Sequence, residues 1–325
     1  MSQPPKKLVA ALRRKNNFLI TSHLNLEGDA LGSEIAVYWL LRKLGKRALI
    51  VNDDRIPYGY EFFPETKIIR RFRKSRYAPK FDCLLLVDCS DLKRCGEISQ
   101  LNLKNKFIIN IDHHIGNDNF GQINWVEPDA SSASELIYKL YKTMDIKLDQ
   151  NSAAALYAGM LTDTGSFRYS NTSAFTHRAV AELMECGINI RKIHRNIYES
   201  VPFSDMQLLS KILPTMKRAA GGKIIWFALK RALLKVRKIS FDLSEHILSF
   251  GRAINGVEVV VLFKENFGAN EVRMNLRSQG KVDVNKIARH FGGGGHKTAS
   301  GCTLSGRIEN IEHRVLAKIK AAIER

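Results

Sequence analysis

The sequence predicts an α/β protein with two domains, a parallel sheet in the first and a smaller α/β domain in the second. Short apolar runs alternate with amphipathic helical segments in the first half, which is typical of β-α-β units. Residues 84–87 are all apolar, and residues 107–111 are apolar except for Asn110, as expected of strands that are covered on both faces. A chain of 325 residues corresponds to two domains of roughly 150 residues each.

The elements of the first domain follow from hydrophobic periodicity and from helix-ending glycines. We expect a short amphipathic helix at the basic N-terminus, strands at 18–21, 48–51, 84–87 and 107–111, and helices at 31–44, 132–142, 151–161 and 173–186. Gly45 and Gly187 end two of these helices.

A charged helical segment separates the two predicted domains. We expect a catalytic domain over residues 1–190, a helical linker over 191–220 and a second domain over 221–325. The boundary is placed at KRAAGGK, residues 217–223, because the composition changes there. The second domain is predicted to contain strands at 224–229, 257–263 and 271–276, helices at 284–290 and 308–323, and a glycine run at 292–295.

The composition limits the classes of protein. With 45% hydrophobic residues the chain is globular, and 51 Lys and Arg against 32 Asp and Glu give it a formal charge of +19, which attracts polyanions such as nucleic acid. Five cysteines without a C-x-x-C pair indicate reduced thiols in the cytoplasm. Because no apolar run approaches the length needed to span a bilayer, we expect no membrane partner. A homodimer is left open.

Histidines and carboxylates follow several predicted strands. His23, Glu27 and Asp29 come after the first strand, Asp88 after 84–87, and Asp112, His113 and His114 after 107–111, while Asp163 follows the helix at 151–161. Because the carboxyl ends of parallel strands meet at one edge of a sheet, we expect these side chains to form one site. A lone histidine or acid at a strand end is usually structural, but a coincidence at four places favours a site.

This mixture of imidazole and carboxylate suits Mn²⁺, Mg²⁺ or Fe²⁺ better than soft metals. The candidate ligands and supports are too many for one ion and about right for two. A pair of divalent ions can share a hydroxide that attacks phosphorus while the cations neutralise the phosphate oxygens. The residues therefore predict metal-dependent hydrolysis of a phosphoester.

The second domain contributes candidate substrate contacts. Glycines can let backbone N–H groups converge on an anion, and arginines bind phosphate bidentately. The candidates are Arg252, Arg277, Ser278, Gly293, Gly294, Gly295 and His296. A flexible turn for the glycine run and solvated or salt-bridged arginines remain the alternatives.

These motifs resemble the DHH phosphoesterase family. Asp112-His113-His114 occurs together with SHLNLEGDALGS (22–33), VDCSD (87–91) and GMLTDTGSF (159–167), while LRS (276–278) and GGGGH (292–296) are similar to its associated domain. The resemblance covers nearly the whole chain in the expected order. It implies a parallel-sheet N-terminal DHH domain and a smaller α/β C-terminal DHH-associated domain, most similar to the branch that cleaves oligoribonucleotides and 3′-phosphoadenosine 5′-phosphate (pAp).

The resemblance also implies roles for the candidates. His23, Glu27 and Asp88 would hold one Mn²⁺, and Asp29, Asp88, His113 and Asp163 a second. His114 would face the substrate phosphate, and Asp112 would orient a metal ligand. The arginines, the glycine run and His296 would grip a nucleotide across a cleft between the domains.

One motif departs from the family pattern. Where the family commonly has Asn-Pro-Asp-Gly-Asp, this chain has Asn25-Leu26-Glu27-Gly28-Asp29. Either Glu27 still reaches a metal, or the first metal site is weaker or prefers another ion.

The leading hypothesis is a Mn²⁺-dependent enzyme that degrades short RNA to mononucleotides and converts pAp to AMP. One alternative keeps the chemistry on a cyclic or linear dinucleotide. Another is a basic nucleic-acid-binding protein whose catalytic site has decayed at Glu27. Pyrophosphate hydrolysis suits a nucleotide-gripping second domain poorly, and a long single-strand exonuclease would need a further nucleic-acid-binding domain.

Overall fold

The chain forms two compact units, Met1–Ser200 and Val201–Arg325. The computed structural model describes residues 3–73, 79–102, 106–231, 243–265 and 270–324. Each unit is described by itself. No helix of these described ranges is long and apolar enough to cross a membrane.

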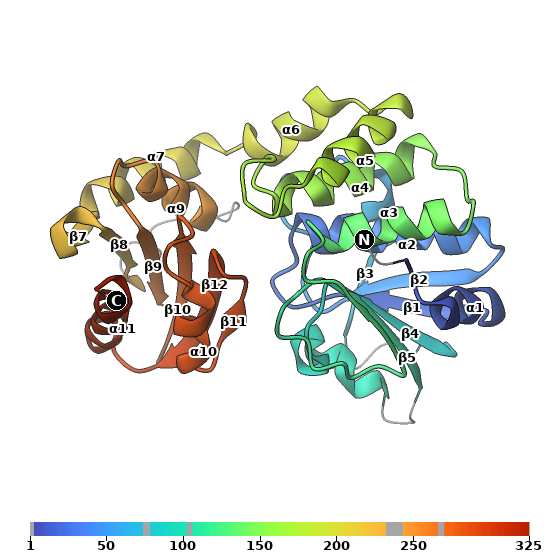
Figure 1. Ribbon diagram of the computed structural model, residues 1–325, viewed down its shortest axis with the longest axis horizontal. Coiled ribbons are helices and arrows are strands. Elements are labelled where there is room, and N and C mark those ends of the chain that lie inside the picture. The colour runs from blue at the N-terminus through green and yellow to red at the C-terminus, as the bar shows by residue number, and fades with distance from the viewer. Residues whose placement is uncertain (1–2, 74–78, 103–105, 232–242, 266–269, 325) are drawn as a thin grey trace. The chain divides into compact units, whose positions relative to one another are not determined.

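The first unit is a parallel six-stranded sheet in the order β3-β2-β1-β4-β5-β6 (Figure 1). Its strands are β1 (Asn17–Thr21), β2 (Arg47–Asn52), β3 (Arg70–Arg71), β4 (Cys83–Val87), β5 (Phe107–Asp112) and β6 (Ile123–Val126). Its helices are α1 (Lys6–Arg14), α2 (Gly28–Lys43), α3 (Ala133–Thr143), α4 (Gln150–Asp163), α5 (Ala174–Glu185) and α6 (Ile190–Tyr198), with 3₁₀ segments η1 (Pro64–Lys67) and η2 (Leu92–Asn102).

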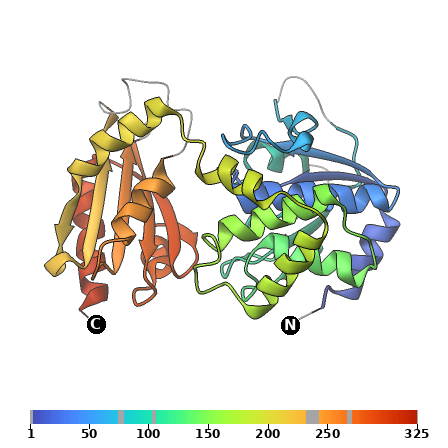
Figure 2. The ribbon, with the colours of Figure 1, turned by 90° about the horizontal axis from the view of Figure 1, so that it is seen from above.

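Both faces of this sheet are covered, as the continuous apolar runs predict. Successive side chains of β4 alternate between the faces. Leu85 and Val87 pack into the larger core with the helices α2 to α4, and Leu84 and Leu86 pack against η2 on the other face. Figure 2 shows the helical layer from above. The predicted α/β fold is confirmed, and strands β3 and β6 were not predicted.

The strand order reverses at β1, which pairs with β2 on one side and with β4 on the other. In such sheets the loops that leave adjacent strands at this point diverge and leave room for a ligand. Two helix boundaries differ from the prediction at the same place. Helix α2 begins at Gly28 rather than at residue 31, and α4 extends to Asp163, so Asp29 and Asp163 lie on helices and not in loops.

The second unit has a mixed six-stranded sheet in the order β11-β12-β10-β9-β8-β7. Its strands are β7 (Lys217–Ala219), β8 (Ile224–Leu229), β9 (Val259–Glu265), β10 (Glu271–Ser278), β11 (Gly294–Gly295) and β12 (Ala299–Ser305). Its helices are α7 (Phe203–Ile212), α9 (Ser244–Arg252), α10 (Val284–His290) and α11 (Ile308–Ile323), with 3₁₀ segments η3 (Leu213–Thr215) and η4 (Ala220–Gly222).

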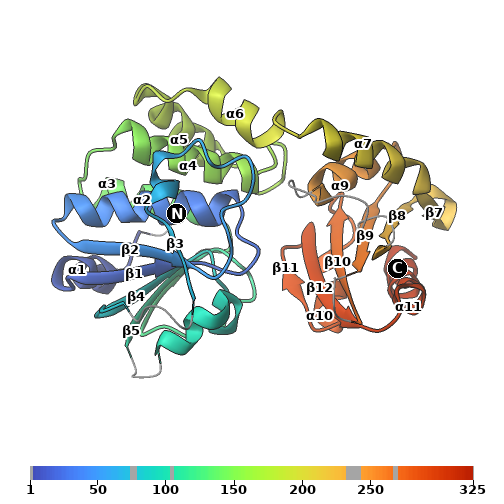
Figure 3. The same ribbon diagram turned by 180° about the vertical axis from the view of Figure 1, so that it is seen from behind.

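Two hydrophobic cores flank this second sheet. Helices α10 and α11 share one core with Val259, Val261 and Phe263, and α7 and α9 share the other with Val260 and Leu262. The elements can be followed in Figure 3. Strands β7 and β12 and helix α9 were not predicted.

The structure divides into its two units at a different place from the boundary predicted at KRAAGGK. Strand β7 pairs antiparallel with β8, and Gly221 and Gly222, with φ of 63° and 92°, make the turn between them. The glycine pair therefore marks a hairpin inside the second unit. The units divide after Ser200, and the predicted linker consists of helices that pack on their own units, α6 on the first and α7 on the second.

Candidate active site

The predicted histidines and acids of the first unit come together at the carboxyl ends of β1, β4 and β5. Among the described residues, three groups in this unit offer ligand atoms within 4.8 Å of one another: His23, Glu27 and Asp88; Asp29, Asp88 and His113; Asp88, Asp112 and His114. Asp163 also reaches this cluster, with its Oδ2 3.6 Å from His113 Nε2. Asp88 belongs to all three groups.

The two carboxylate oxygens of Asp88 face different histidines. Oδ2 lies 3.2 Å from His23 Nε2, and Oδ1 lies 3.5 Å from His113 Nε2. Asp88 follows β4 directly and has a φ of 53°, a left-handed conformation that costs energy for a residue with a side chain. Its Oδ1 is buried and accepts no hydrogen bond from the described residues, so one oxygen of a buried carboxylate has no protein donor.

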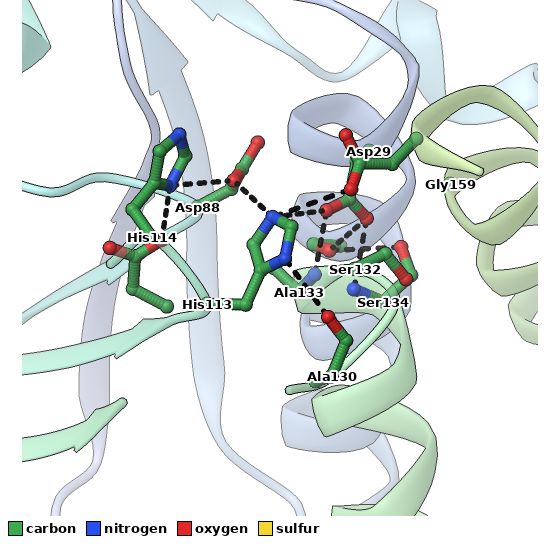
Figure 4. Close-up of polar contacts among 12 residues, drawn as sticks. Asp29, Asp88, His113, His114, Ala130, Ser132, Ala133, Ser134 and Gly159 are labelled. Atoms are coloured by element: carbon green, nitrogen blue, oxygen red, sulfur yellow. Dashed lines mark hydrogen bonds and ion pairs between the residues drawn. The ribbon is translucent and has the colours of Figure 1, made fainter. Parts of the chain in front are cut away.

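Backbone carbonyls set the tautomers of the two metal-facing histidines. His23 Nδ1 lies 2.7 Å from the Leu24 carbonyl. His113 Nδ1 lies 3.3 Å from the Ala130 carbonyl (Figure 4). A carbonyl only accepts, so Nδ1 carries the proton and the lone pair of the neutral ring is on Nε2. In both rings Nε2 faces carboxylate oxygens, an arrangement that needs a proton or a cation between the acceptors.

The charges at this site shift the pKa values of its histidines and acids. Burial by itself would lower the pKa of His113, but the carboxylates of Asp163, Asp88 and Asp29 outweigh it and raise the pKa. Burial would raise the pKa of Asp88, but the neighbouring histidines hold it well below its usual range. A divalent cation would replace these protons, because metal ligands bind in their deprotonated form.

Asp29 is held by the beginning of α3 (Figure 4). Its Oδ2 accepts a hydrogen bond from the Ala133 N–H at 2.6 Å, and its Oδ1 accepts one from the Ser134 N–H at 2.9 Å. These N–H groups have no partner within a helix, and the helix N-terminus favours a negative charge. The remaining lone pairs of the fully buried carboxylate can serve a cation, on the side where Oδ2 lies 3.8 Å from His113 Nε2.

Glu27 lies at the position where the chain departs from the family motif. It is the residue before α2, and its carboxylate shares a cluster with His23 and Asp88. Burial, followed by the charges of Asp88 and Asp163, raises the pKa of Glu27 to about 8. Leu26 is 7% exposed and packs into the larger core. Leucine therefore anchors the loop by packing, and the longer acid is within reach of the cluster.

Asp112 is hydrogen-bonded to His114, the last residue of the DHH motif. Its Oδ1 accepts a hydrogen bond from His114 Nδ1 at 2.7 Å, and its Oδ2 accepts one from Asn117 Nδ2 at 2.6 Å. Burial opposes the shift, but His114 lowers the pKa of Asp112 to about 2. Asp112 therefore contacts His114 directly, and its role in orienting a metal ligand stays a prediction. Asn117 was not predicted, although it follows the DHH motif by three residues.

The cluster fits divalent cations of the hard or borderline kind. It joins imidazole Nε2 atoms with carboxylates from several elements, includes the buried Asp88 oxygen that has no donor, and contains no thiol among its members. So many buried acids repel one another unless positive charge lies between them. The donor set matches that of Mn²⁺, Mg²⁺ or Fe²⁺ sites.

The substrate candidates of the second unit lie around β10 and the turn after α10. Arg252 is the last residue of α9, and Arg277, on β10, forms a close ion pair with Glu245. Ser278 is buried, and its hydroxyl accepts a hydrogen bond from the Gly280 N–H at 2.9 Å. Arg277 is thus salt-bridged, one of the alternatives considered from the sequence.

The glycine run has a structural part and an open part. The N–H groups of Gly292 and Gly293 donate to the Arg289 and Ala288 carbonyls and end α10. A Cβ on Gly293 would lie 2.3 Å from the Gly301 oxygen, whereas one on Gly294 would meet nothing within 4 Å. Gly294 and Gly295 form β11, and the His296 N–H donates to the Ala299 carbonyl. The first two glycines therefore cannot cradle an anion with their N–H groups.

Comparison with known proteins agrees with this geometry. Residues 17–160 match the DHH family, N-terminal domain, and residues 230–325 match the DHHA1 domain. The chain belongs to the DHH family. It is a metal-dependent phosphoesterase, and the buried histidine and aspartate cluster is its candidate metal centre.

Relatives at modest identity cover most of the chain. The bifunctional oligoribonuclease and PAP phosphatase NrnA of Thermus thermophilus is 28% identical over 307 residues, 94% of this chain and 90% of that protein. The protein of the same name from Bacillus subtilis is 32% identical over 200 residues, 61% of this chain and 62% of that protein. The crystal structure of an exopolyphosphatase-related protein from Bacteroides fragilis superimposes with a TM-score of 0.87 at 27% identity, covering 98% of this chain and 97% of that one.

Proposed function

We propose that this DHH phosphoesterase hydrolyses short oligoribonucleotides to mononucleotides and pAp to AMP, with two Mn²⁺ ions in the first unit. The observation that carries the proposal is Asp88, whose two oxygens face His23 and His113 separately, as a carboxylate shared between two cations would. The relatives named as oligoribonuclease and PAP phosphatase support the choice of substrates.

The ligands divide into two sets around Asp88. His23 and Glu27 would hold one ion, and Asp29, His113 and Asp163 would hold the other. When bound, divalent cations neutralise phosphate oxygens and promote the ionisation of water. The protein contributes the orientation of the ligands. The Leu24 and Ala130 carbonyls keep Nε2 of the two histidines directed at the cluster, and α3 holds Asp29 in place.

His114 is the proposed substrate contact in the first unit. Asp112 fixes its ring through Nδ1, and Asn117 donates to the other oxygen of Asp112. The second ring nitrogen is then directed to a phosphate oxygen as the proposed partner. In the second unit we propose Arg252, Arg277, Ser278, Gly294, Gly295 and His296 as nucleotide contacts. For Gly293 we propose only a structural role: it lets the chain turn tightly after α10, so that the nucleotide contacts that follow it are correctly placed.

The test is hydrolysis by purified protein with Mn²⁺ of a short oligoribonucleotide, pAp and a cyclic dinucleotide. We expect mononucleotide from the RNA and phosphate from pAp, with both activities lost in Asp88→Asn. The matched control is Asp145→Asn, which makes the same change at an exposed carboxylate and should retain activity. Turnover of the cyclic dinucleotide alone would contradict the proposed substrates, and salt-sensitive RNA binding without any turnover would favour the binding protein.

A further inference from the structure

A basic groove lies on the second unit between the C-terminal end of α10 and α11. It has a volume of about 520 Å³, and its lining includes His290, Phe291, His313, Arg314 and Lys318. The described residues that line it include no aspartate or glutamate. The two helices can be located in Figure 3. This groove is distinct from the proposed nucleotide contacts on α9, β10 and β11.

The periodicity of α11 puts its contributions on one helix face. Residues 314, 317, 318 and 321 are spaced by three or four positions, so they project to the same side. The acids of the helix are engaged elsewhere. Glu309 pairs with Lys230 at 2.6 Å, and Glu312 pairs with Lys217 at 3.4 Å. Among the described residues, no carboxylate oxygen lies within 4 Å of Arg314 or Lys318, so their charge is not compensated by an ion pair.

An aromatic ring supports the basic side chains. The Arg314 guanidinium carbon lies 5.7 Å from the centroid of the Phe291 ring, and the His290 ring packs edge-on against the same phenylalanine at 5.0 Å. A cation over a ring is stabilised there, and the contact restricts its side chain. Arginine held in this way loses less conformational freedom when it binds a phosphate group.

We propose that this α10–α11 groove binds the phosphodiester backbone of single-stranded RNA. Basic side chains interleaved with an aromatic ring are the features that bind single strands without reading their sequence. Phe291 precedes the glycine run directly, so RNA bound in the groove would continue toward the proposed nucleotide contacts of the same unit. The choice of RNA as the ligand rests on the proposed function, while the groove itself rests on its lining and charge.

The test measures binding without turnover. Fluorescence anisotropy of a labelled oligouridylate of 12 nucleotides is recorded with full-length protein in EDTA, as a function of salt. In the double variant Arg314→Gln and Lys318→Gln we expect binding about tenfold weaker, and a slope of log K against log salt reduced by about 1.4, because each phosphate contact on a single strand contributes about 0.7. The matched control, Arg307→Gln and Lys320→Gln, removes the same two charges outside the groove and should bind like the wild type.

Three outcomes would overturn the proposal. Equal weakening in both double variants would show that only net charge matters, and equal competition by polyglutamate of the same charge would show that the groove does not select RNA. Photocrosslinking of 4-thiouridine RNA to the unmodified protein gives a second readout. We expect adducts in residues 290–291 and 313–318, and adducts that map only elsewhere would overturn the assignment. Because no hydrolysis is measured, failure of the catalytic proposal is detected separately by the substrate panel.

Discussion

Replacing Gly159 with alanine should damage the metal centre from a position outside the ligand set. Gly159 lies in α4 beside Asp29 and Ser134 (Figure 4). A Cβ at this position would lie 1.9 Å from Ser134 Oγ and 2.7 Å from Asp29 Oδ1. Alanine normally favours a helix over glycine, so a loss of stability here would report the steric contact and not the helix propensity.

The size of the effect follows from three contributions. Forcing a methyl group into packed atoms costs about 1–3 kcal/mol, and displacing Asp29 from its N–H donor loses a charge-assisted hydrogen bond of about 1.5–3 kcal/mol. The gain in helix propensity returns about 1 kcal/mol. The sum is a destabilisation of about 1.5–5 kcal/mol, together with weaker Mn²⁺ binding because Asp29 moves.

The assay is thermal unfolding together with a Mn²⁺ titration followed by electron paramagnetic resonance. Adding Ser134→Gly to Gly159→Ala removes the nearest clashing atoms, Oγ at 1.9 Å and Cβ at 2.7 Å, and should restore part of the lost stability. Ser134→Gly alone is the control for the loss of the serine. An unchanged melting temperature and unchanged Mn²⁺ affinity in Gly159→Ala would refute the reasoning, since Asp29 could then move without cost.

Three further predictions test other side chains in the first unit. Burial raises the pKa of Glu34 to about 8, so the folded protein keeps a proton that the unfolded chain releases above about 4.5. The wild type therefore loses stability as the pH rises through this window, and the non-titrating Glu34→Gln should become relatively more stable by a few kcal/mol. Denaturant unfolding of both proteins at pH 5 and pH 8 would measure this. A difference in unfolding free energy between the two proteins that does not change with pH would contradict the prediction. Asn117→Ala removes a hydrogen-bond donor to Asp112 and should lower kcat about tenfold or more with little change in KM. A change in KM alone, with kcat unchanged, would rule out orientation of His114. Glu27→Gln removes the charge of the proposed ligand and should weaken Mn²⁺ binding about tenfold, and calorimetry that shows equal affinity would exclude Glu27 as a ligand.

The local sequence pattern, in which polar residues follow apolar strands, was enough to predict which residues approach one another at the edge of the sheet. His23, Asp88 and His113 each follow an apolar strand, and parallel strands place their carboxyl ends together whatever the intervening loops contain. The partners of these residues could not be predicted in the same way. Asp29 is held by Ala133, 104 residues later in the chain, and no local pattern specifies that α3 begins at this point.

The contact partner of Asp112 could not be predicted for a related reason. Adjacent positions in a motif leave open which neighbour a side chain contacts, and the contact with His114 is set by the backbone after β5 and by Asn117. Similarly, the glycine pair at 221–222 suggested a domain boundary in the sequence, because glycine is common both in linkers and in tight turns. Only pairing of β7 with β8 distinguishes the two.

The sequence by itself determined the α/β class, the strand-end clusters of histidine and acid, and the basic charge, because these depend on local periodicity and composition. Tertiary structure alone decided that Asp88 presents its two oxygens to two histidines, that α3 binds Asp29, that Gly159 leaves room for both, and that side chains of α10 and α11 line one groove. Each of these requires segments distant in the chain to pack within a few ångströms, and such packing is specified by the whole core and not by any one motif.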